Sequence, residues 1–200
     1  MEKLKKRLPA KERKKQILKS AVKVFARSNY YNTKMSDIAK EAGISEAMIY
    51  RHFSSKKEIF IVVLKHMSDR ILTFWERELD PVKSPLEKLR SMLLGYYQRM
   101  TKHPNELKVQ FLAISGIDDK DVLKRLRTDQ QNYIKHFSDV IQEGISQREI
   151  RKDVDVNALA FAYNGSGIMM NMMRLLGFTR KFNEKTVVSL IDHFIESIKA

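Results

Sequence analysis

The sequence predicts an all-α protein, in which a compact N-terminal unit of three helices precedes a longer helical domain, with about nine helices in all. Three observations support this class. Apolar residues recur at helical spacing along most of the chain, helix start and stop signals separate the periodic segments, and no useful length of strand-like alternation occurs. Hydrophobic residues make up 43% of the 200 residues, which is enough to build a core.

The first two predicted helices cover about residues 11–28 and 35–42, each with one apolar face. We expect Thr33 to cap the second helix by accepting hydrogen bonds from its free N–H groups. Gly43 follows that helix directly, and glycine is favoured there because a left-handed turn residue carries no Cβ clash. A short helix therefore ends in a tight turn.

The third predicted helix covers residues 46–53 and is capped by Ser45. Ser55 and Glu58 have the spacing of a capping box, which predicts the start of a long fourth helix. A short helix, a glycine turn and a second short helix form the pattern of a helix-turn-helix, here at residues 34–53.

The rest of the chain follows the same logic. A break near residues 80–83 precedes Ser84, Pro85 and Glu87, which combine a capping box with proline at the first helical position. We read Asp118 and Asp119 as the N-terminal cap of a later helix. One helix is predicted from Pro85 towards His103, and the others cover residues 106–115 and about 118–148, 156–176 and 184–199.

Positive charge is concentrated at the N-terminus. The net charge is +14, and residues 1–57 hold 16 Lys and Arg against 5 Asp and Glu, a net of +11. A uniformly solvated surface does not predict such asymmetry, whereas a polyanionic partner does. A peripheral membrane protein is disfavoured, because the first fifteen residues have lysine on all sides and only Leu4 and Leu8 as apolar anchors.

Helical phase sorts the side chains of the 46–53 helix. Ile49 and Phe53 share the face that docks on the core, while Ala47 and Arg51 point away from it. An exposed face of this kind can enter the major groove, where alanine can contact a thymine methyl and arginine can reach guanine or phosphate. The predicted DNA-contacting residues are Thr33, Lys34, Ser36, Ser45, Glu46, Ala47, Tyr50, Arg51, His52 and Lys56.

Residues 13–64 resemble the DNA-binding domain of the TetR (tetracycline repressor) family. The residues that carry the resemblance are Ile17-Leu18, Ala21, Phe25-Ala26, Tyr30, Thr33, Asp37-Ile38-Ala39, Ala42-Gly43-Ile44-Ser45, Ile49-Tyr50, His52-Phe53, Lys56 and Glu58. The resemblance implies a homodimer formed through the last two helices and a variable ligand pocket between the middle helices. It also implies that Thr33, Tyr50, His52 and Lys56 hold the DNA backbone. One departure is Asn29, where the family usually has glycine, and asparagine tolerates the left-handed conformation better than most residues.

These observations predict three segments. Residues 1–10 form a basic arm, which either tracks the adjacent minor groove or only aids solubility. Residues 11–71 form the DNA-binding domain, and residues 72–200 form a ligand-binding and dimerisation domain.

Bulky, adaptable side chains crowd the middle and late helices, and methionine suits irregular apolar ligands. From the sequence alone, plain core explains them more simply, whereas the resemblance favours a pocket for a hydrophobic or amphipathic effector. The candidate pocket residues are Tyr96, Tyr97, Met100, Phe111, Phe137, Tyr163, Met169 and Met170.

The last helix carries apolar residues over more of its circumference than one neighbour can cover, which predicts a homodimer interface. The candidate interface residues are Val187, Ile191, Phe194, Ile195 and Ile198.

Several functions are disfavoured. The chain has no cysteine, its five histidines lack metal-ligand spacing, and no nucleophile–base constellation is evident, so we expect neither an enzyme nor a metal or cofactor site. No signal peptide or membrane span is recognisable, which favours a cytoplasmic protein.

We therefore expect a transcriptional regulator, a repressor released from a pseudo-palindromic DNA operator by an apolar or amphipathic small molecule. The alternative is an effector-independent architectural DNA-binding protein that only dimerises through its C-terminal domain.

Overall fold

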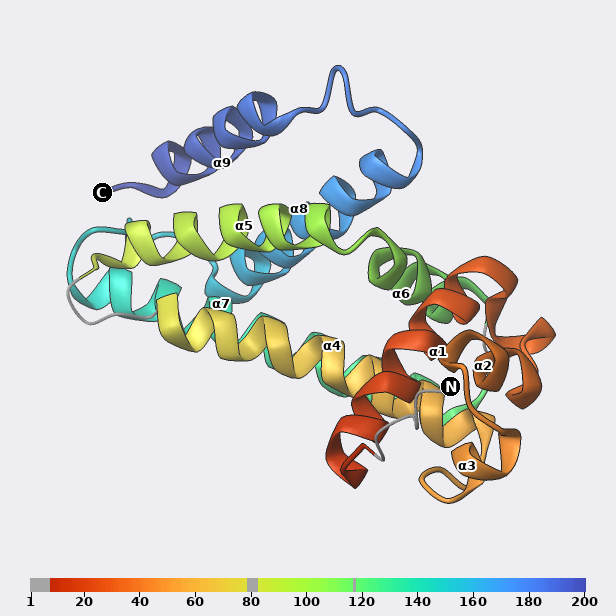
Figure 1. Ribbon diagram of the computed structural model, residues 1–200. Helices are drawn as coiled ribbons and strands as arrows, with labels where there is room; N and C mark the ends of the chain where they lie inside the picture. The colour runs from red at the N-terminus through yellow and green to blue at the C-terminus, as the bar shows by residue number, and fades with distance from the viewer. Residues whose placement is uncertain (1–7, 79–82, 117) are drawn as a thin grey trace. The chain divides into compact units, whose positions relative to one another are not determined.

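The computed structural model describes residues 8–78, 83–116 and 118–200 (Figure 1). The all-α prediction is confirmed for these residues, which form α1 (Ala10–Asn32), α2 (Met35–Ala42), α3 (Glu46–Tyr50), α4 (Lys56–Glu78), α5 (Pro85–Lys102), α6 (Pro104–Gly116), α7 (Lys120–Ser146), α8 (Val156–Leu175) and α9 (Glu184–Ile198). Part of the predicted basic arm, residues 1–7, lies outside them.

The chain divides into two compact units. The first comprises the chain up to residue 67 together with residues 108–125, and the second comprises residues 68–107 and 126–200. The sequence suggested a single division after residue 71. The contacts instead group the end of α6 and the start of α7 with the DNA-binding helices, a long-range association that local patterns do not reveal.

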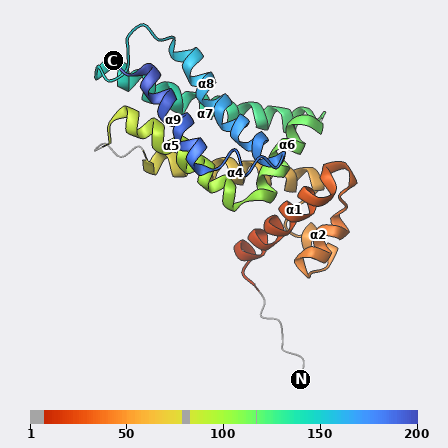
Figure 2. The ribbon, with the colours of Figure 1, turned by 90° about the horizontal axis from the view of Figure 1, so that it is seen from above.

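The first unit is built around the apolar face of α1, which packs on α2 (Figure 2). Phe25 of α1 is buried and meets Phe60 of α4 edge to face, with ring centroids 4.9 Å apart. Ile17 of α1 and Ile38 of α2 are also fully buried. These contacts form the core of the unit that includes the short helix α3.

Asn29 breaks the helical geometry near the end of α1. Its φ of 59° and ψ of 178° lie in a region that L-residues other than glycine rarely adopt. The Asn29 Oδ1 atom accepts a hydrogen bond from the Asn32 N–H at 3.0 Å, which helps to hold the bend. The structure thus confirms that asparagine serves here in a left-handed position.

The capping predictions have mixed outcomes. Ser84 and Glu87 form the expected reciprocal pair at the start of α5. At the start of α4, the Glu58 N–H donates to Ser55 Oγ as expected, but the Glu58 carboxylate accepts from Ser54 rather than from Ser55. The second half of that predicted capping box is therefore wrong by one residue, because the carboxylate reaches both the backbone N–H and the hydroxyl of Ser54.

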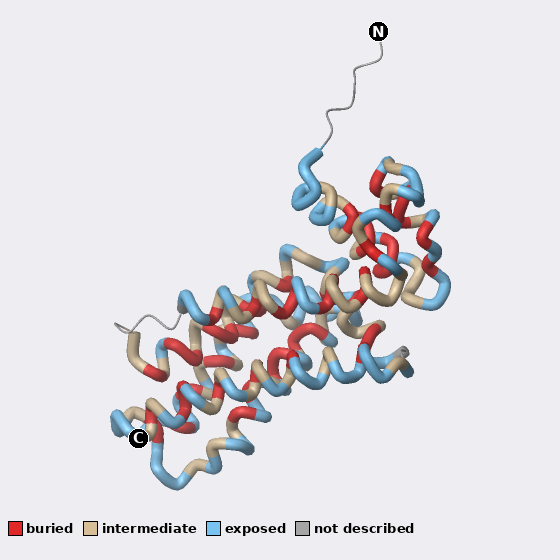
Figure 3. The backbone as a smooth tube through the Cα atoms, turned by 90° about the horizontal axis from the view of Figure 1, so that it is seen from below, coloured by how far each residue is buried: buried red, intermediate tan, exposed pale blue. Residues whose placement is uncertain are grey.

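In the second unit, α5 packs on both α8 and α9. Buried residues follow the inward sides of these helices and exposed residues the outward sides (Figure 3). Trp75 at the end of α4 is 3% exposed, and its indole N–H donates to the Met92 carbonyl at 3.1 Å. Its ring contacts Tyr133 and Phe137, so an aromatic cluster forms the centre of this unit.

Candidate nucleic-acid interface

The turn between α2 and α3 is held by hydrogen bonds at both of its ends. Gly43 has a φ of 64°, and the next N–H, that of Ile44, donates to the Ala39 carbonyl at 3.1 Å. Ser45 Oγ accepts from the Met48 N–H at 3.2 Å, which confirms Ser45 as the cap of α3. Gln16 of α1 donates to the Ala42 carbonyl at 2.8 Å, so the turn is also held against α1.

α3 presents two different faces. Ile49 is fully buried and Phe53, just beyond the helix, is 3% exposed, which confirms that this side docks on the core. Ala47 and Arg51 are exposed, and Tyr50 is 52% exposed. The helix ends at Tyr50 rather than at Phe53, so Arg51 stands at its C-terminal cap. A small, a cationic and an aromatic side chain are thus available to a partner on one surface.

The remaining predicted DNA-contacting residues surround this surface. Four of them are exposed, namely Lys34, Ser36, Ser45 and Glu46, and His52 is half-buried. Thr33 differs, because it is 1% exposed and its hydroxyl donates to the Asn29 carbonyl at 2.5 Å. Thr33 does not cap α2 as expected. The Asp37 carboxylate instead accepts from the Lys34 N–H at 2.9 Å, and this acidic residue also complements the positive end of the helix dipole.

Lys56 joins α4 to the segment between α1 and α2. Its ammonium group donates to the Thr33 carbonyl at 2.8 Å and to the Tyr31 carbonyl at 3.2 Å, and it lies 4.7 Å from the centroid of the Tyr30 ring. Burial lowers the pKa of this ammonium group. Since an ammonium group has three N–H donors, one remains for an external acceptor such as a phosphate oxygen.

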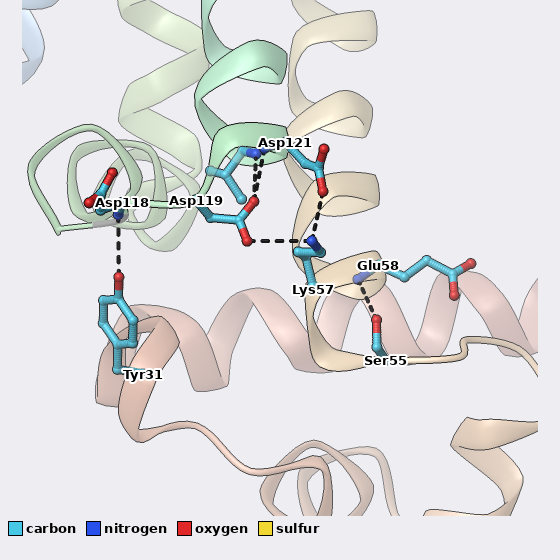
Figure 4. Close-up of polar contacts among 8 residues, drawn as sticks. Tyr31, Ser55, Lys57, Glu58, Asp118, Asp119 and Asp121 are labelled. Atoms are coloured by element: carbon cyan, nitrogen blue, oxygen red, sulfur yellow. Dashed lines mark hydrogen bonds and ion pairs between the residues drawn. The ribbon is translucent and has the colours of Figure 1, made fainter.

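An acidic segment at the start of α7 binds the neighbouring lysine of α4 (Figure 4). Lys57 Nζ lies 2.7 Å from Asp121 Oδ2 and 3.4 Å from Asp119 Oδ2. Asp119 also accepts from the N–H groups of Asp121 and Val122, which makes it the cap of α7. The backbone N–H of Asp118 donates to the Tyr31 hydroxyl at 3.3 Å, so Asp118 does not share the capping role expected of both residues.

The segment 118–121 was missed as part of this site because its partners lie more than 60 residues away in the chain. Lys57 and Tyr31 are surface residues with no motif of their own, and no local signal pairs them with the acidic segment. From the sequence, Asp118 and Asp119 were predicted only to cap a helix.

Two further searches were limited to the described residues. No group of three or more His, Asp or Glu side chains there could hold a metal ion. None of the helices that the structure describes is both long and apolar enough to cross a membrane.

Two family models match the chain. The N-terminal model, described as bacterial regulatory proteins of the tetR family, matches residues 17–63, and the model described as tetracyclin repressor-like, C-terminal domain, matches residues 82–172. Together they span more than two thirds of the chain. The chain belongs to the TetR family. It is therefore a DNA-binding transcriptional regulator with a helical C-terminal domain.

Curated relatives have related descriptions. The HTH-type transcriptional repressor KstR2 of Mycolicibacterium smegmatis is 27% identical over 145 residues, which cover 72% of this chain and 71% of that protein. The fatty acid metabolism regulator protein of Bacillus subtilis is 25% identical over 141 residues, covering 70% of this chain and 72% of that protein. Both are named as regulators rather than enzymes.

Solved structures share the fold. The transcriptional regulator FadR from Bacillus subtilis, in complex with stearoyl-CoA, matches with a TM-score of 0.78 and 21% identity over 91% of this chain and 95% of that chain. The putative fatty acid metabolism regulator of Clostridium perfringens matches with a TM-score of 0.79 and 24% identity over 92% and 98%.

The candidate pocket residues of this TetR-family regulator are mostly interior. Seven of the eight belong to the second unit, and of these Met169 is half-buried. The other six are buried, namely Tyr96, Tyr97, Met100, Phe137, Tyr163 and Met170. Phe111 belongs to the first unit, because the division falls within α6. The predicted set therefore combines residues of two units.

Polar groups interrupt this apolar interior. Asn171 is 3% exposed and its amide donates to the Tyr96 hydroxyl at 2.5 Å. Burial raises the pKa of Tyr96 to about 12, an effect that the bond from Asn171 only partly offsets. The Tyr163 hydroxyl is buried with no hydrogen-bond partner among the residues that the structure describes, and burial raises its pKa as well. An unsatisfied buried hydroxyl costs free energy, so it is a natural place for a ligand acceptor.

The predicted interface residues of α9 lie inside the chain. Val187, Ile191, Ile195 and Ile198 are at most 9% exposed in the single chain, and Phe194 is half-buried with its ring 5.3 Å from that of Tyr163. Their assignment to the dimer interface stays a prediction, because these burial values describe one chain without a partner. α9 packs on α5 of the same chain, which buries one side of the helix, whereas Val188, Leu190 and Phe194 are only half-buried.

Proposed function

We propose that two copies of this regulator read an inverted-repeat operator through α3 and release it when each copy binds a lipid with a long acyl chain. One observation supports the DNA-reading part of this proposal. α3 is capped by Ser45, buries one face against the core and exposes the other, and it lies within the strongly basic N-terminal quarter of the chain. In this proposal, Ala47 and Arg51 contact base edges, and Tyr50, His52 and the free donor of Lys56 contact phosphates. The protein acts on chromosomal DNA in the cytoplasm and has no catalytic step.

The class of effector is suggested by relatives and by the interior of the second unit. One relative is named as a regulator of fatty acid metabolism, and a protein of the same fold was solved with stearoyl-CoA. The interior holds aromatic and methionine side chains around a small number of polar groups, among them the unpaired Tyr163 hydroxyl. An apolar lining with few polar anchors is typical of lipid and drug-sized ligand sites.

A second copy would dock on α8. Phe161, Ile168, Met172 and Leu176 are 38–62% exposed, and their spacing places them on one face of the helix. Gly165 lies within that stripe, and a Cβ there would meet no atom within 4 Å, so the partner helix can approach its backbone. A single chain leaves this apolar face in water, and two-fold symmetry would cover it with the same face of the second copy.

One observation favours the effector-independent alternative. Rings of the second unit contact one another at 5.0 Å (Trp75 and Phe137) and 5.7 Å (Phe137 and Tyr163), as in a filled core. An effector would have to displace these contacts.

Selection from a random DNA pool tests the proposal. We expect an inverted repeat with half-sites about one helical turn or a multiple apart. A thermal shift with oleoyl-CoA then separates the two candidates, because only a ligand-responsive regulator is stabilised by it. A wild-type protein that selects no consensus would contradict the DNA-reading assignment.

A further inference from the structure

A groove of about 410 Å³ lies on the second unit, lined by the end of α4 and the C-terminal half of α5. Phe74 and Leu94 supply its apolar part, and Arg99, Lys102 and His103 supply cationic or polar nitrogen groups. Gly95 makes room for the Phe74 ring, which lies against the α5 backbone, because a Cβ at this position would collide with that ring. The groove volume lies within the range of sites that take small molecules.

Positively charged side chains outnumber negatively charged ones around the groove. None of the described residues that line it is a carboxylate. Of the acidic groups nearby, Glu184 accepts from Gln98 at 2.7 Å, and Glu106 pairs with Arg70 and lies 3.9 Å from His103 Nδ1. Arg174 of α8 binds Thr101 on the same turns of α5 and adds a further positive charge. Cations at a helix C-terminus complement the helix dipole. That effect accounts for the charges but not for the groove between them.

The groove and the aromatic interior are lined by neighbouring residues of α4 and α5. Phe74 lines the groove, whereas the next residue, Trp75, is 3% exposed and contacts the interior rings. Gly95 likewise lines the groove, whereas Tyr96 is 8% exposed and bonds to Asn171. The Phe74 ring lies against Gly95 and closes the space between the two regions, so a single amphipathic molecule reaches both only when that ring moves aside.

We propose that this groove binds the phosphate-bearing head group of the effector, while the acyl chain enters the aromatic interior. The guanidinium fork of Arg99 suits bidentate contact with phosphate, and Lys102 adds a second charge. The proposal rests on the lipid-effector part of the proposed function. It makes the effector a phosphorylated acyl compound, such as an acyl-CoA or a lysophospholipid, rather than a free fatty acid.

Calorimetric titration of the full-length protein with oleoyl-CoA, oleate, CoA and oleoyl lysophosphatidic acid tests this. We expect oleoyl-CoA to bind more tightly than oleate. The variant Arg99→Gln/Lys102→Gln should weaken the binding of oleoyl-CoA about a hundredfold, since each of the two lost charged hydrogen bonds weakens binding by about tenfold. Binding of oleate should stay the same. Lys152→Gln, an exposed lysine of the connector before α8, is the matched control and should change neither affinity.

The remaining outcomes distinguish the groove from the proposed function. The groove assignment is overturned, while lipid sensing stands, by either of two results. The double variant binds oleoyl-CoA as tightly as the wild type does, or its affinity for oleate falls by the same factor as its affinity for oleoyl-CoA. If neither lipid binds the wild type, the effector proposal fails and the groove assignment with it. If lysophosphatidic acid binds and depends on Arg99 while oleoyl-CoA does not bind, the groove holds and the lipid source is a phospholipid. Arg99→Lys keeps the charge but loses the bidentate fork, so it should recover only part of the affinity that the double variant loses. Unchanged binding of oleate guards against a folding defect in the double variant.

Discussion

Lys57 of α4 and Asp121 of α7 are joined by an ion pair of 2.7 Å, although 64 residues separate them in the chain. The hydrogen bond to Asp121 is the main cause that raises the pKa of Lys57. Lys57 follows Lys56, which holds the carbonyl groups of Tyr31 and Thr33. The acidic segment 118–121 is thereby connected to the part of the module that carries the predicted phosphate contacts.

Asp119 gives this connection a pH dependence. The N–H of Val122 is the main cause that lowers the pKa of Asp119 below its usual 3.8, with Asp121 N–H and Lys57 adding to it. A carboxyl group with a lowered pKa stabilises the fold above its usual pKa, and that stability is lost as the pH falls through the lower folded value. In urea titrations between pH 5 and pH 3, we expect Asp119→Asn to lose less stability than the wild type. Equal losses in the two proteins would show that Asp119 does not contribute.

Asn29 tests the backbone geometry of α1. Because its φ is 59°, replacement by alanine should destabilise the protein relative to replacement by glycine by about 1–2 kcal/mol. Both substitutions remove the bond to the Asn32 N–H, so their difference isolates the conformational cost. Chemical denaturation of the two variants measures it. Equal stability of the two variants would mean that residue 29 does not adopt the left-handed conformation.

The outward face of α3 should carry operator affinity without carrying stability. Arg51→Ala should weaken specific binding by about 1–3 kcal/mol if the guanidinium reads a base, and Tyr50→Ala should weaken binding with no change in melting temperature. Lys40→Ala, an exposed residue of α2 outside the predicted set, is the control. Gel-shift titrations in which all three variants match the wild type would remove α3 from the groove.

The α8 stripe should hold the dimer. Ile168→Glu places a charge in the proposed apolar interface and should yield monomers that lose operator binding. Leu123→Glu makes the same change at a residue of equal exposure, 38%, on α7, and should remain dimeric. Sedimentation velocity at micromolar concentration distinguishes them. A wild-type monomer under these conditions, or a dimer that tolerates the charge, would contradict the assignment.

Local signals predicted most of the fold. Gly43, Ser45 and Ser84 were recognised because their hydrogen bonds lie within three or four residues of the chain. The inward face of α3 followed from helical phase, which places Ile49 and Phe53 together. Such features need no knowledge of the tertiary structure.

Long-range packing determined what the sequence could not reveal. The apolar breadth of α9 was seen in the sequence, but the packing of one of its sides on α5 of the same chain and the exposed apolar stripe on α8 were not. Thr33 had the right type and position for a cap, yet its hydroxyl turns back to the Asn29 carbonyl. Which of two available partners a side chain takes depends on neighbours distant in sequence.

The most direct test of the account is a titration of oleoyl-CoA into a complex of the full-length protein with fluorescently labelled operator, followed by anisotropy. The account predicts that the anisotropy falls to that of free DNA as oleoyl-CoA saturates the protein, and that CoA alone at the same concentration leaves the complex intact. An unchanged anisotropy at saturating oleoyl-CoA, with binding of the lipid verified by calorimetry, would contradict the claim that effector binding releases the operator.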